Sequence, residues 1–356
     1  MTASLRFWGV ALLLFVALLY LFRDILLPFV VGLGAAYFLD PVADRLEALL
    51  RSRALAAVLA MLAFYAAVFA FFLLFWPVLE SQITALGERA PDYLEKGREF
   101  LQPYLMGLFP DLSLEAVGAV KAAAGVEAGK VLAWAGTLVG HVWSGGLAFF
   151  NLVSLALITP IVLFYLLRDW DKIVRRVDGW LPKAQAPTIR AQLCEIDRTL
   201  AGFVRGQATV CLLLGAFYGI GLALVGLDFG LVIGIATGLL SFIPYFGMAI
   251  GFVVGVTLAI LQFPDWLPVA IVAGVFLLGQ ALEGNFLTPK LVGERIGLHP
   301  VWVIFALLAG GALAGFLGVL LAVPIAAVLG VMARFAIGRY QESAYYLGTS
   351  GGDAKP

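Results

Sequence analysis

Residues 280–289 read QALEGNFLTP, and they lie between two almost wholly apolar runs, residues 266–279 and 301–332. The stretch contains a carboxylate, two amides, a hydroxyl and a proline. A carboxylate inside a membrane costs about 2.5–3.5 kcal/mol on insertion scales unless it faces protein, water or a cation. Two interpretations stay open: a polar lining past which a solute or ion moves, or a membrane boundary with ordinary capping residues.

The composition excludes an ordinary soluble protein. Of the 356 residues, 62% are hydrophobic and only 13% are charged, and the mean hydropathy is +1.00. Soluble domains carry about 25% charged residues. We therefore expect an all-α, polytopic membrane protein with about eight to ten membrane helices, short or re-entrant hairpins included. The formal net charge of zero gives no general case for binding nucleic acid.

Hydropathy predicts a division of the chain into six segments. In order, these are N-terminal membrane helices (1–79), an extracytoplasmic amphipathic helical region (80–146), a membrane helix (147–167), a cytoplasmic amphipathic segment (168–205), a C-terminal membrane core with broken hairpins (206–340) and a flexible tail (341–356).

Two apolar runs are too long for one simple span. Residues 229–263 are interrupted by IPYFG (243–247), and residues 301–332 are interrupted by glycines. Each half holds about 15 residues, fewer than the ~20 that cross a hydrocarbon layer of ~30 Å. The turn with Pro244 and Gly247 either re-enters the membrane and lines a cavity or lies outside the membrane. Irregular backbone at membrane depth requires protein or water around it.

Prolines are expected to end helices, because proline lacks an N–H and clashes with the preceding turn. Asp40-Pro41 is expected to close a pair of short or tilted N-terminal helices, and Pro91 and Pro110 to divide the amphipathic region. Pro289 is expected to end the helix that reaches it.

An apolar stripe with helical spacing occurs within the basic segment 168–205. It consists of Ile189, Leu193, Ile196, Leu200 and Phe203. Steps of three and four residues place these side chains on one face of an amphipathic helix. That face packs on the membrane helices, lies in the headgroup plane or meets a partner helix.

Enzymatic, metal and cofactor sites are not expected. The two cysteines, Cys194 and Cys211, lie on different predicted elements and do not suggest a disulfide or a metal site. The pair His141 and Ser144 has no third group to orient it, and it reads as an interface turn. No zinc-binding His-Glu-x-x-His sequence and no glycine-rich phosphate loop occurs.

Basic loops predict the orientation, because lysine and arginine concentrate on the cytoplasmic side. Placing Arg45, Arg51 and Arg53 inside puts the acidic region 80–130 outside and the basic segment 168–205 inside. Both termini are then cytoplasmic.

Several short motifs follow one another along the chain. They are Leu39-Asp40-Pro41, Asp197-Arg198-Thr199-Leu200, Phe203-Val204-Arg205-Gly206-Gln207, Ile243-Pro244-Tyr245-Phe246-Gly247, Glu283 to Gly293, Leu298-His299-Pro300 and Leu321-Ala322-Val323-Pro324. In order and spacing, they resemble the autoinducer-2 exporter (PerM-like) permease family over nearly the whole chain.

The resemblance implies a protein of the bacterial inner membrane. It implies export of the signalling molecule autoinducer-2, as assigned to some members, or sodium/proton antiport, as assigned to others. The candidate substrate or ion pathway comprises Gln280, Glu283, Asn285, Thr288, Pro289, Pro244 and Gly247. The candidate cytoplasmic motif comprises Asp197, Arg198, Arg205 and Gln207.

Three functions compete at this point. The first is a transporter or exporter of a small polar solute, which is gradient-driven or passive because a nucleotide motif is lacking. The second is a cation/proton antiporter in which Glu283 carries the proton. The third is a scaffold that transports nothing. The apolar, glycine-rich faces also suggest a homo-oligomer.

The predicted orientation is testable by thiol labelling. A cysteine introduced into the region 80–130 is expected to react with an impermeant thiol reagent from the periplasmic side. A cysteine introduced beside Lys183 is expected not to react from that side. Labelling in the reverse sense would overturn the orientation.

Overall fold

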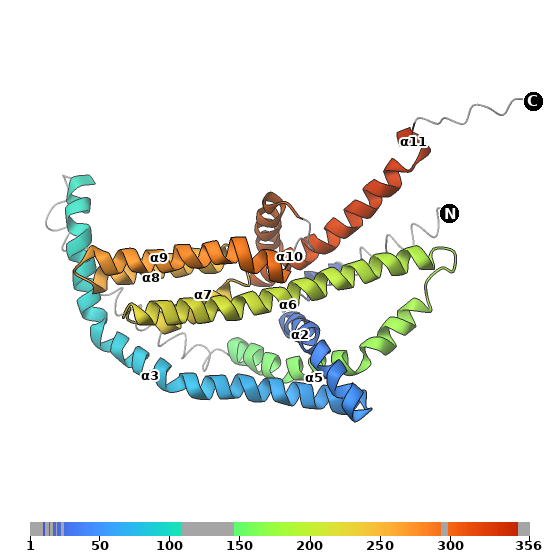
Figure 1. Cartoon of the computed structure of the whole chain (residues 1–356), viewed down its shortest axis with the longest axis horizontal. Helices are drawn as coiled ribbons and strands as arrows, with labels where there is room; N and C mark the ends of the chain where they lie inside the picture. Colours follow the sequence, from blue (N-terminus) through green and yellow to red (C-terminus); the bar gives the residue numbers. More distant parts are fainter. Residues whose placement is uncertain are drawn as a thin grey trace, which may run out of the picture. The chain divides into compact units, whose positions relative to one another are not determined.

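The structure, a computed structural model, describes residues 25–108, 146–292 and 298–347, together with isolated positions between 10 and 22. Every regular element in these ranges is a helix (Figure 1). Pro110, His141 and Ser144 lie outside the described residues.

The helices follow one another with short connections. They are α2 (Leu27–Leu50), α3 (Arg53–Leu108), α5 (Gly146–Asp178), α6 (Ala186–Leu224), α7 (Gly230–Leu240), α8 (Phe246–Gln262), α9 (Trp266–Leu282), the π-helix η2 (Glu283–Val292), α10 (Pro300–Gln341) and α11 (Ala344–Leu347).

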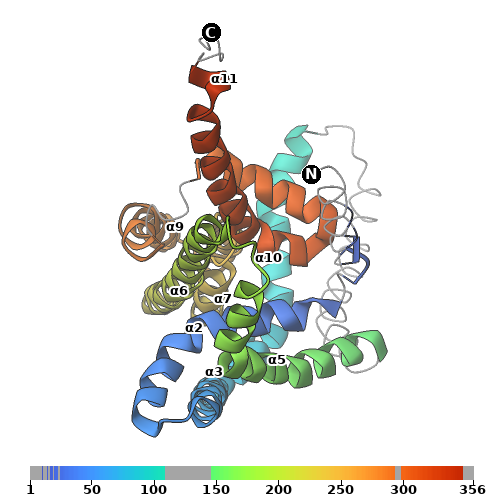
Figure 2. The same cartoon turned by 90° about the vertical axis from the view of Figure 1, so that its right-hand side faces the viewer.

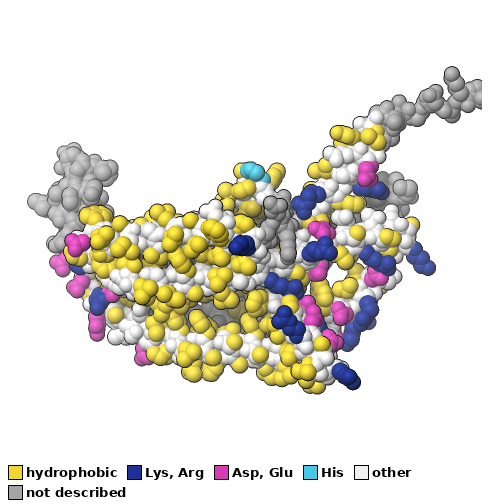
Figure 3. Space-filling model, in the orientation of Figure 1, with side chains coloured by type: hydrophobic (Ala, Val, Ile, Leu, Met, Phe, Trp, Pro, Cys, Tyr) yellow, Lys and Arg dark blue, Asp and Glu magenta, His cyan; other side chains and the backbone are white. Residues whose placement is uncertain are grey.

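Six helices in the described part of the chain are long and apolar enough to cross a membrane. They are Leu27–Leu50, Arg53–Gln82, Val153–Asp178, Ala186–Leu224, Trp266–Leu291 and Pro300–Gln341. Large hydrophobic side chains remain exposed along them, and hydrophobic atoms cover much of the visible surface in Figure 3. An apolar surface of this extent suits lipid and not water, so the expected all-α, polytopic membrane fold is confirmed.

The chain forms two compact units. Unit 1 comprises Met1–Met61, Thr159–Cys211 and Leu282–Pro356, and unit 2 comprises Leu62–Ile158 and Leu212–Ala281. Helices α3, α5, α6 and α9 each contribute residues to both units.

In unit 2, α7 and α8 form the hairpin that the broken apolar run predicts. With 11 and 17 residues, they are about 17 and 26 Å long, shorter than a hydrocarbon layer of ~30 Å. Glycine permits their close approach: a Cβ atom built on Gly247 would lie 2.3 Å from the Ser241 nitrogen, and one on Gly251 would lie 2.1 Å from Thr237 Oγ1. Pro244 lies in the connecting turn, where Tyr245 has a φ of 68°.

In unit 1, α10 contains the break that glycines predict within residues 301–332. The backbone leaves helical geometry at Ala314 and Gly315, where Gly315 has a φ of 58°. Figure 2 shows α10 changing direction sharply. The two halves touch beside the break, because a Cβ on Gly310 would lie only 2.4 Å from the Gly318 carbonyl oxygen.

The expectation that prolines end helices is wrong at three positions. Pro41 lies inside α2, and Pro91 lies inside the 56-residue α3. Pro289 lies inside η2, where the hydrogen-bond pattern has already changed from α to π at Glu283. A wider turn moves the preceding carbonyls away from the proline ring, which relieves the clash that would stop an α-helix.

The amphipathic stripe and the membrane span that follows it form one helix. α6 runs without interruption from Ala186 to Leu224. Leu193 near its start is 47% exposed, whereas Phe203 is only 2% exposed. The later part of the stripe therefore packs inside the protein, in agreement with the first of its three interpretations.

Close packing of α7 against α6 is testable at Gly234. A Cβ on Gly234 would lie 2.1 Å from the backbone nitrogen of Gly219, whereas one on Gly274 meets nothing within 4 Å. Gly234→Ala is expected to lower the thermal stability of the solubilised protein, since overpacking costs about 1–3 kcal/mol. Gly274→Ala, the control, is expected to be neutral or slightly stabilising, because alanine favours helix by about 1 kcal/mol. Equal melting temperatures for the two variants would contradict this packing.

Candidate functional site

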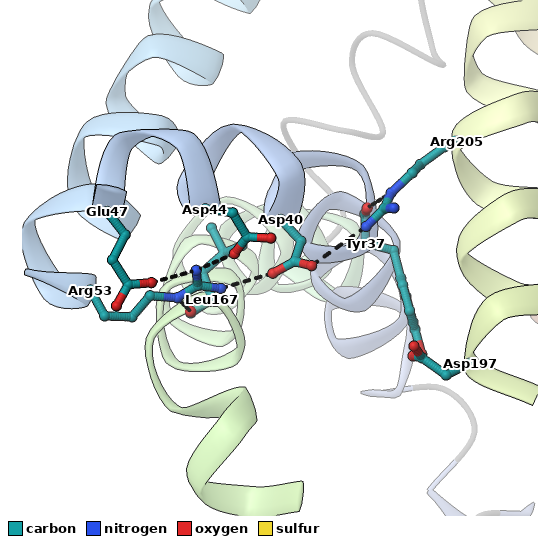
Figure 4. A network of polar contacts seen from close by, with 8 residues as sticks. All are labelled: Tyr37, Asp40, Asp44, Glu47, Arg53, Leu167, Asp197 and Arg205. Carbon is teal, nitrogen blue, oxygen red and sulfur yellow. Dashed lines mark hydrogen bonds and ion pairs between the residues drawn. The ribbon is translucent and has the colours of Figure 1, made fainter. Parts of the chain in front are cut away.

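Arg53 is the centre of a cluster of charged side chains in unit 1 (Figure 4). Its guanidinium lies 2.8 Å from Asp40, 2.5 Å from Asp44 and 3.0 Å from Glu47. These acids are four and three residues apart, so they share one face of α2. The Nε of Arg53 also donates to the Leu167 carbonyl of α5 at 2.7 Å. One largely buried side chain, 17% exposed, thus joins α2, α3 and α5.

Arg205 on α6 supplies a hydrogen bond that Pro41 removes. In an α-helix the N–H of residue i donates to the carbonyl of residue i−4, and proline has no N–H. The Tyr37 carbonyl therefore lacks its helical donor. Arg205 Nε donates to this oxygen at 2.7 Å, and Arg205 Nη2 lies 3.4 Å from Asp40. The carbonyl that Pro41 leaves without a donor is thus bound by an arginine 168 residues away from Tyr37 in sequence.

Tyr37 makes a second connection between α2 and α6. Its hydroxyl donates to Asp197 Oδ1 at 3.0 Å. Its ring meets Trp170 of α5 edge-on, with 6.1 Å between ring centroids. Tyr37 therefore contacts both neighbouring helices, one through a hydrogen bond and one through an aromatic pair.

These residues border a cleft of about 520 Å³ within unit 1. Its polar lining consists of Tyr37, Asp40, Cys194, Asp197, Arg198 and Arg205. Its apolar lining includes Leu33, Ala36, Leu166, Leu167, Trp170, Ala201 and Leu291. The volume falls in the range of about 300–1,000 Å³ that is usual for small-molecule sites.

The charges of the lining balance. Asp40 and Asp197 supply two carboxylates, and Arg198 and Arg205 supply two guanidinium groups. Arg198 pairs only loosely with Glu195, at 3.2 Å, and its side chain is 72% exposed. The cleft can donate and accept hydrogen bonds, but it has no net charge with which to select an ion of one sign.

The structure brings three of the four predicted cytoplasmic-motif residues to this cleft. Asp197, Arg198 and Arg205 line it, whereas Gln207 is buried on α6 and 5% exposed.

The predicted pathway residues are distributed between the two units. Gln280, Pro244 and Gly247 belong to unit 2. Glu283, Asn285, Thr288 and Pro289 belong to unit 1, on η2. The same π-helix carries Leu291, which lines the cleft.

Glu283 is the acid that begins the π-helix. Its side chain is partly buried, and within the described residues it forms neither a hydrogen bond nor an ion pair. A partly buried, unpaired carboxylate in a membrane helix is an unusual and costly feature.

Sequence reasoning missed Tyr37, Asp40 and Arg53 as members of the site. The signal was present in Pro41, because a proline inside a helix leaves a carbonyl that needs a donor. Nothing in the sequence identifies Arg205 as that donor.

A second polar cluster lies in unit 2, outside the candidate spans. Asp228 accepts hydrogen bonds from Arg89 and from the Tyr93 hydroxyl of α3. The Asp228 N–H donates to Gln262 Oε1 at 2.7 Å. Burial and the Asp228 carboxylate raise the pKa of Tyr93 to about 12, so its hydroxyl stays protonated and remains a donor near neutral pH. The cluster joins α3 to the α6–α7 connection and to the end of α8.

Sequence comparison decides the family. A family model described as AI-2E family transporter matches residues 10–337. The chain belongs to this transporter family. The resemblance drawn from the short motifs is thereby confirmed, and the chain is a multi-pass membrane transporter.

Relatives of this AI-2E family member are known in several bacteria. YrrI of Bacillus subtilis (strain 168), provisionally named a transport protein, is 31% identical over 312 residues, 87% of this chain and 86% of YrrI. PerM of Escherichia coli (strain K12), provisionally named a permease, is 26% identical over 313 residues, 88% of this chain and 87% of PerM. The match thus covers most of both chains in each case.

The contribution of the Arg53 contacts to the stability of this AI-2E family member is testable. Arg53→Gln is expected to lower the free energy of unfolding by about 2–3 kcal/mol, between the values for exposed and buried ion pairs. Arg51→Gln removes the same charge two residues away, where the side chain is exposed, and is expected to have little effect. Denaturant or thermal unfolding in detergent measures both. Equal stability of the two variants would show that the Arg53 contacts contribute nothing.

Proposed function

We propose that the protein moves a small polar solute across the cell membrane and that the cleft of unit 1 lies on the path of this solute. The observation that supports the proposal is a cleft of about 520 Å³ among membrane helices, lined by two carboxylates, two guanidinium groups and a phenol. Ionisable side chains among membrane helices are rare and often mark the path of a substrate or an ion.

The lining favours an uncharged or zwitterionic solute. Balanced charges supply hydrogen-bond donors and acceptors without attracting ions of one sign. Trp170 and Tyr37 add aromatic faces against which the apolar side of such a solute can pack. Autoinducer-2, for which the family is named, is therefore the first solute to test.

Short and broken helices support a transport function. The α7–α8 hairpin, the kink of α10 and η2 leave backbone groups outside regular α-helical bonding. Broken helices at membrane depth recur in transporters, where free helix ends contribute partial charges to a site. Because the chain has no nucleotide-binding loop, we propose a gradient-driven or passive mechanism.

A natural cysteine provides the test. Cys194 lines the cleft and is exposed, whereas Cys211 is buried. A bulky maleimide is expected to modify Cys194 and to reduce flux of labelled autoinducer-2 into proteoliposomes to background. Cys194→Ser, the control, is expected to transport normally and to resist the reagent. In addition, saturating solute is expected to slow the modification of Cys194.

Two outcomes would contradict the proposal. Unchanged flux after complete modification of Cys194 would place the path elsewhere. No flux of any small polar solute by folded, inserted protein would remove the transport function proposed for the cleft.

A cation/proton antiporter is the second candidate, and Glu283 favours it. Its carboxylate is partly buried on η2 and forms no described ion pair, so it is available to a proton or a cation. A desolvated carboxylate binds a proton more readily than an exposed one.

Glu283→Gln separates the two candidates, because it keeps the size of the side chain and removes its charge. If Glu283 carries a proton, the variant is expected to lose the pH dependence of flux while remaining folded. If Glu283 only hydrogen-bonds a polar solute, flux is expected to fall with its pH dependence retained, by about tenfold for 1.4 kcal/mol of lost binding. Wild-type flux with a wild-type pH profile would exclude both roles.

A further inference from the structure

The end of α5 extends beyond the length that a membrane core requires. Its candidate span, Val153–Asp178, has 26 residues and is therefore about 39 Å long. A hydrocarbon layer is about 30 Å thick. If this helix lies perpendicular to the membrane, about 9 Å of its length, or about six residues, lies outside the hydrocarbon. The basic end of the helix, around Arg175 and Arg176, is the part suited to that layer.

The exposed side chains at this end form an apolar strip and, next to it, a basic strip that contains Arg175 and Arg176. Every residue from 171 to 177 is exposed. Ile173, Val174 and Val177 are 44%, 48% and 39% exposed, and their steps of one and three residues place them on one side of the helix. Trp180, 74% exposed, follows the helix end by two residues. Tryptophan is enriched where a membrane meets water.

Internal ion pairs leave this end with an excess of positive charge. Asp169 is paired with Arg168 at 2.5 Å and with Lys172 at 2.8 Å. Asp178 is held by Arg190 of α6 through two hydrogen bonds, at 2.5 and 2.9 Å.

The remaining charges are three bases and one acid. Among the described residues, Arg175, Arg176, Lys183 and Asp171 form no ion pair. Of these, Arg175 and Arg176 lie on α5 beside the exposed apolar side chains.

We propose that this surface, made of Ile173, Val174, Arg175, Arg176, Val177 and Trp180, binds the headgroups of anionic phospholipids in the surrounding bilayer. Guanidinium groups match phosphate oxygens through paired, charge-assisted hydrogen bonds. The apolar strip lies at the boundary of the acyl chains, as in interfacial amphipathic helices. Neutral phospholipids fit the apolar strip but do not offset the excess positive charge.

The same surface is connected to the helix that carries the cleft residues. The two-fold hydrogen bond of Asp178 with Arg190 joins the end of α5 to the beginning of α6. Seven residues along α6, Asp197 lines the cleft. Bound lipid therefore anchors the start of this helix, although lipid binding itself does not depend on the function proposed for the cleft.

A local fluorescence measurement tests the proposal. Gly179→Cys in a Cys194→Ser background offers one reactive thiol beside the surface, since Cys211 is buried. The thiol carries a nitrobenzoxadiazole fluorophore, and the protein is reconstituted in equimolar phosphatidylglycerol and phosphatidylcholine. Either lipid is spin-labelled near its headgroup in turn. Spin-labelled phosphatidylglycerol is expected to quench the fluorophore more strongly than spin-labelled phosphatidylcholine, and added salt is expected to reduce the difference.

Two double variants provide the control. Arg175→Gln with Arg176→Gln is expected to lower the preference for phosphatidylglycerol about fivefold per charge removed, which corresponds to about 1 kcal/mol for each basic side chain near an anionic surface. Arg175→Lys with Arg176→Lys retains the charge and is expected to retain most of the preference. Both arginines are exposed, so the fold is expected to persist in both variants.

Three results would overturn the proposal. Equal quenching by the two lipids at low salt would show that the surface does not select anionic headgroups. A preference that survives the glutamine variant would assign it to other residues. No quenching by either lipid would show that water or a protein partner, and not the bilayer, covers this surface.

Discussion

The carbonyl oxygen of Tyr37 is the constraint on which unit 1 depends. Pro41 cannot donate to it, and an unpaired carbonyl costs free energy when it is shielded from water. Arg205 donates a hydrogen bond to this oxygen, and this contact places its guanidinium group beside Asp40. Asp40 in turn lies against Arg53, which binds α5. A single missing N–H thus explains why Arg205 of α6 lies beside the acidic side chains that Arg53 binds.

The sequence was sufficient for the features that depend on local pattern. Alternation of long apolar runs with basic loops predicted an all-helical membrane protein, and glycines and Pro244 predicted the broken hairpins. Asp197 and Arg205 of the predicted cytoplasmic motif line the cleft, although the sequence predicted no cleft there. These inferences hold because hydrophobic length and turn chemistry act over a few residues.

The prolines inside helices and the cleft depend on contacts between distant parts of the chain, which no local pattern specifies. Pro41, Pro91 and Pro289 were expected to end helices, yet each lies inside one. Whether a proline stops a helix depends on what meets the freed carbonyl, and at Pro41 that partner is 164 residues away in the chain. The cleft likewise requires Tyr37, Trp170 and Asp197 from three helices, and their proximity is a property of packing, not of sequence spacing.

The short distances in sequence around Arg53 bear on how the chain enters the membrane. Its three acidic partners precede it by 13, 9 and 6 residues, and only Arg51 and Ser52 separate α2 from α3. Arg53 can therefore pair with these acids as soon as the first turn of α3 has been synthesised. Arg205 reaches Asp40 only after about 150 further residues have followed, at a synthesis rate of about 5–20 residues per second. The ion pairs between α2 and the start of α3 can thus form during translation, several seconds before the part of α6 that carries Arg205 has been synthesised.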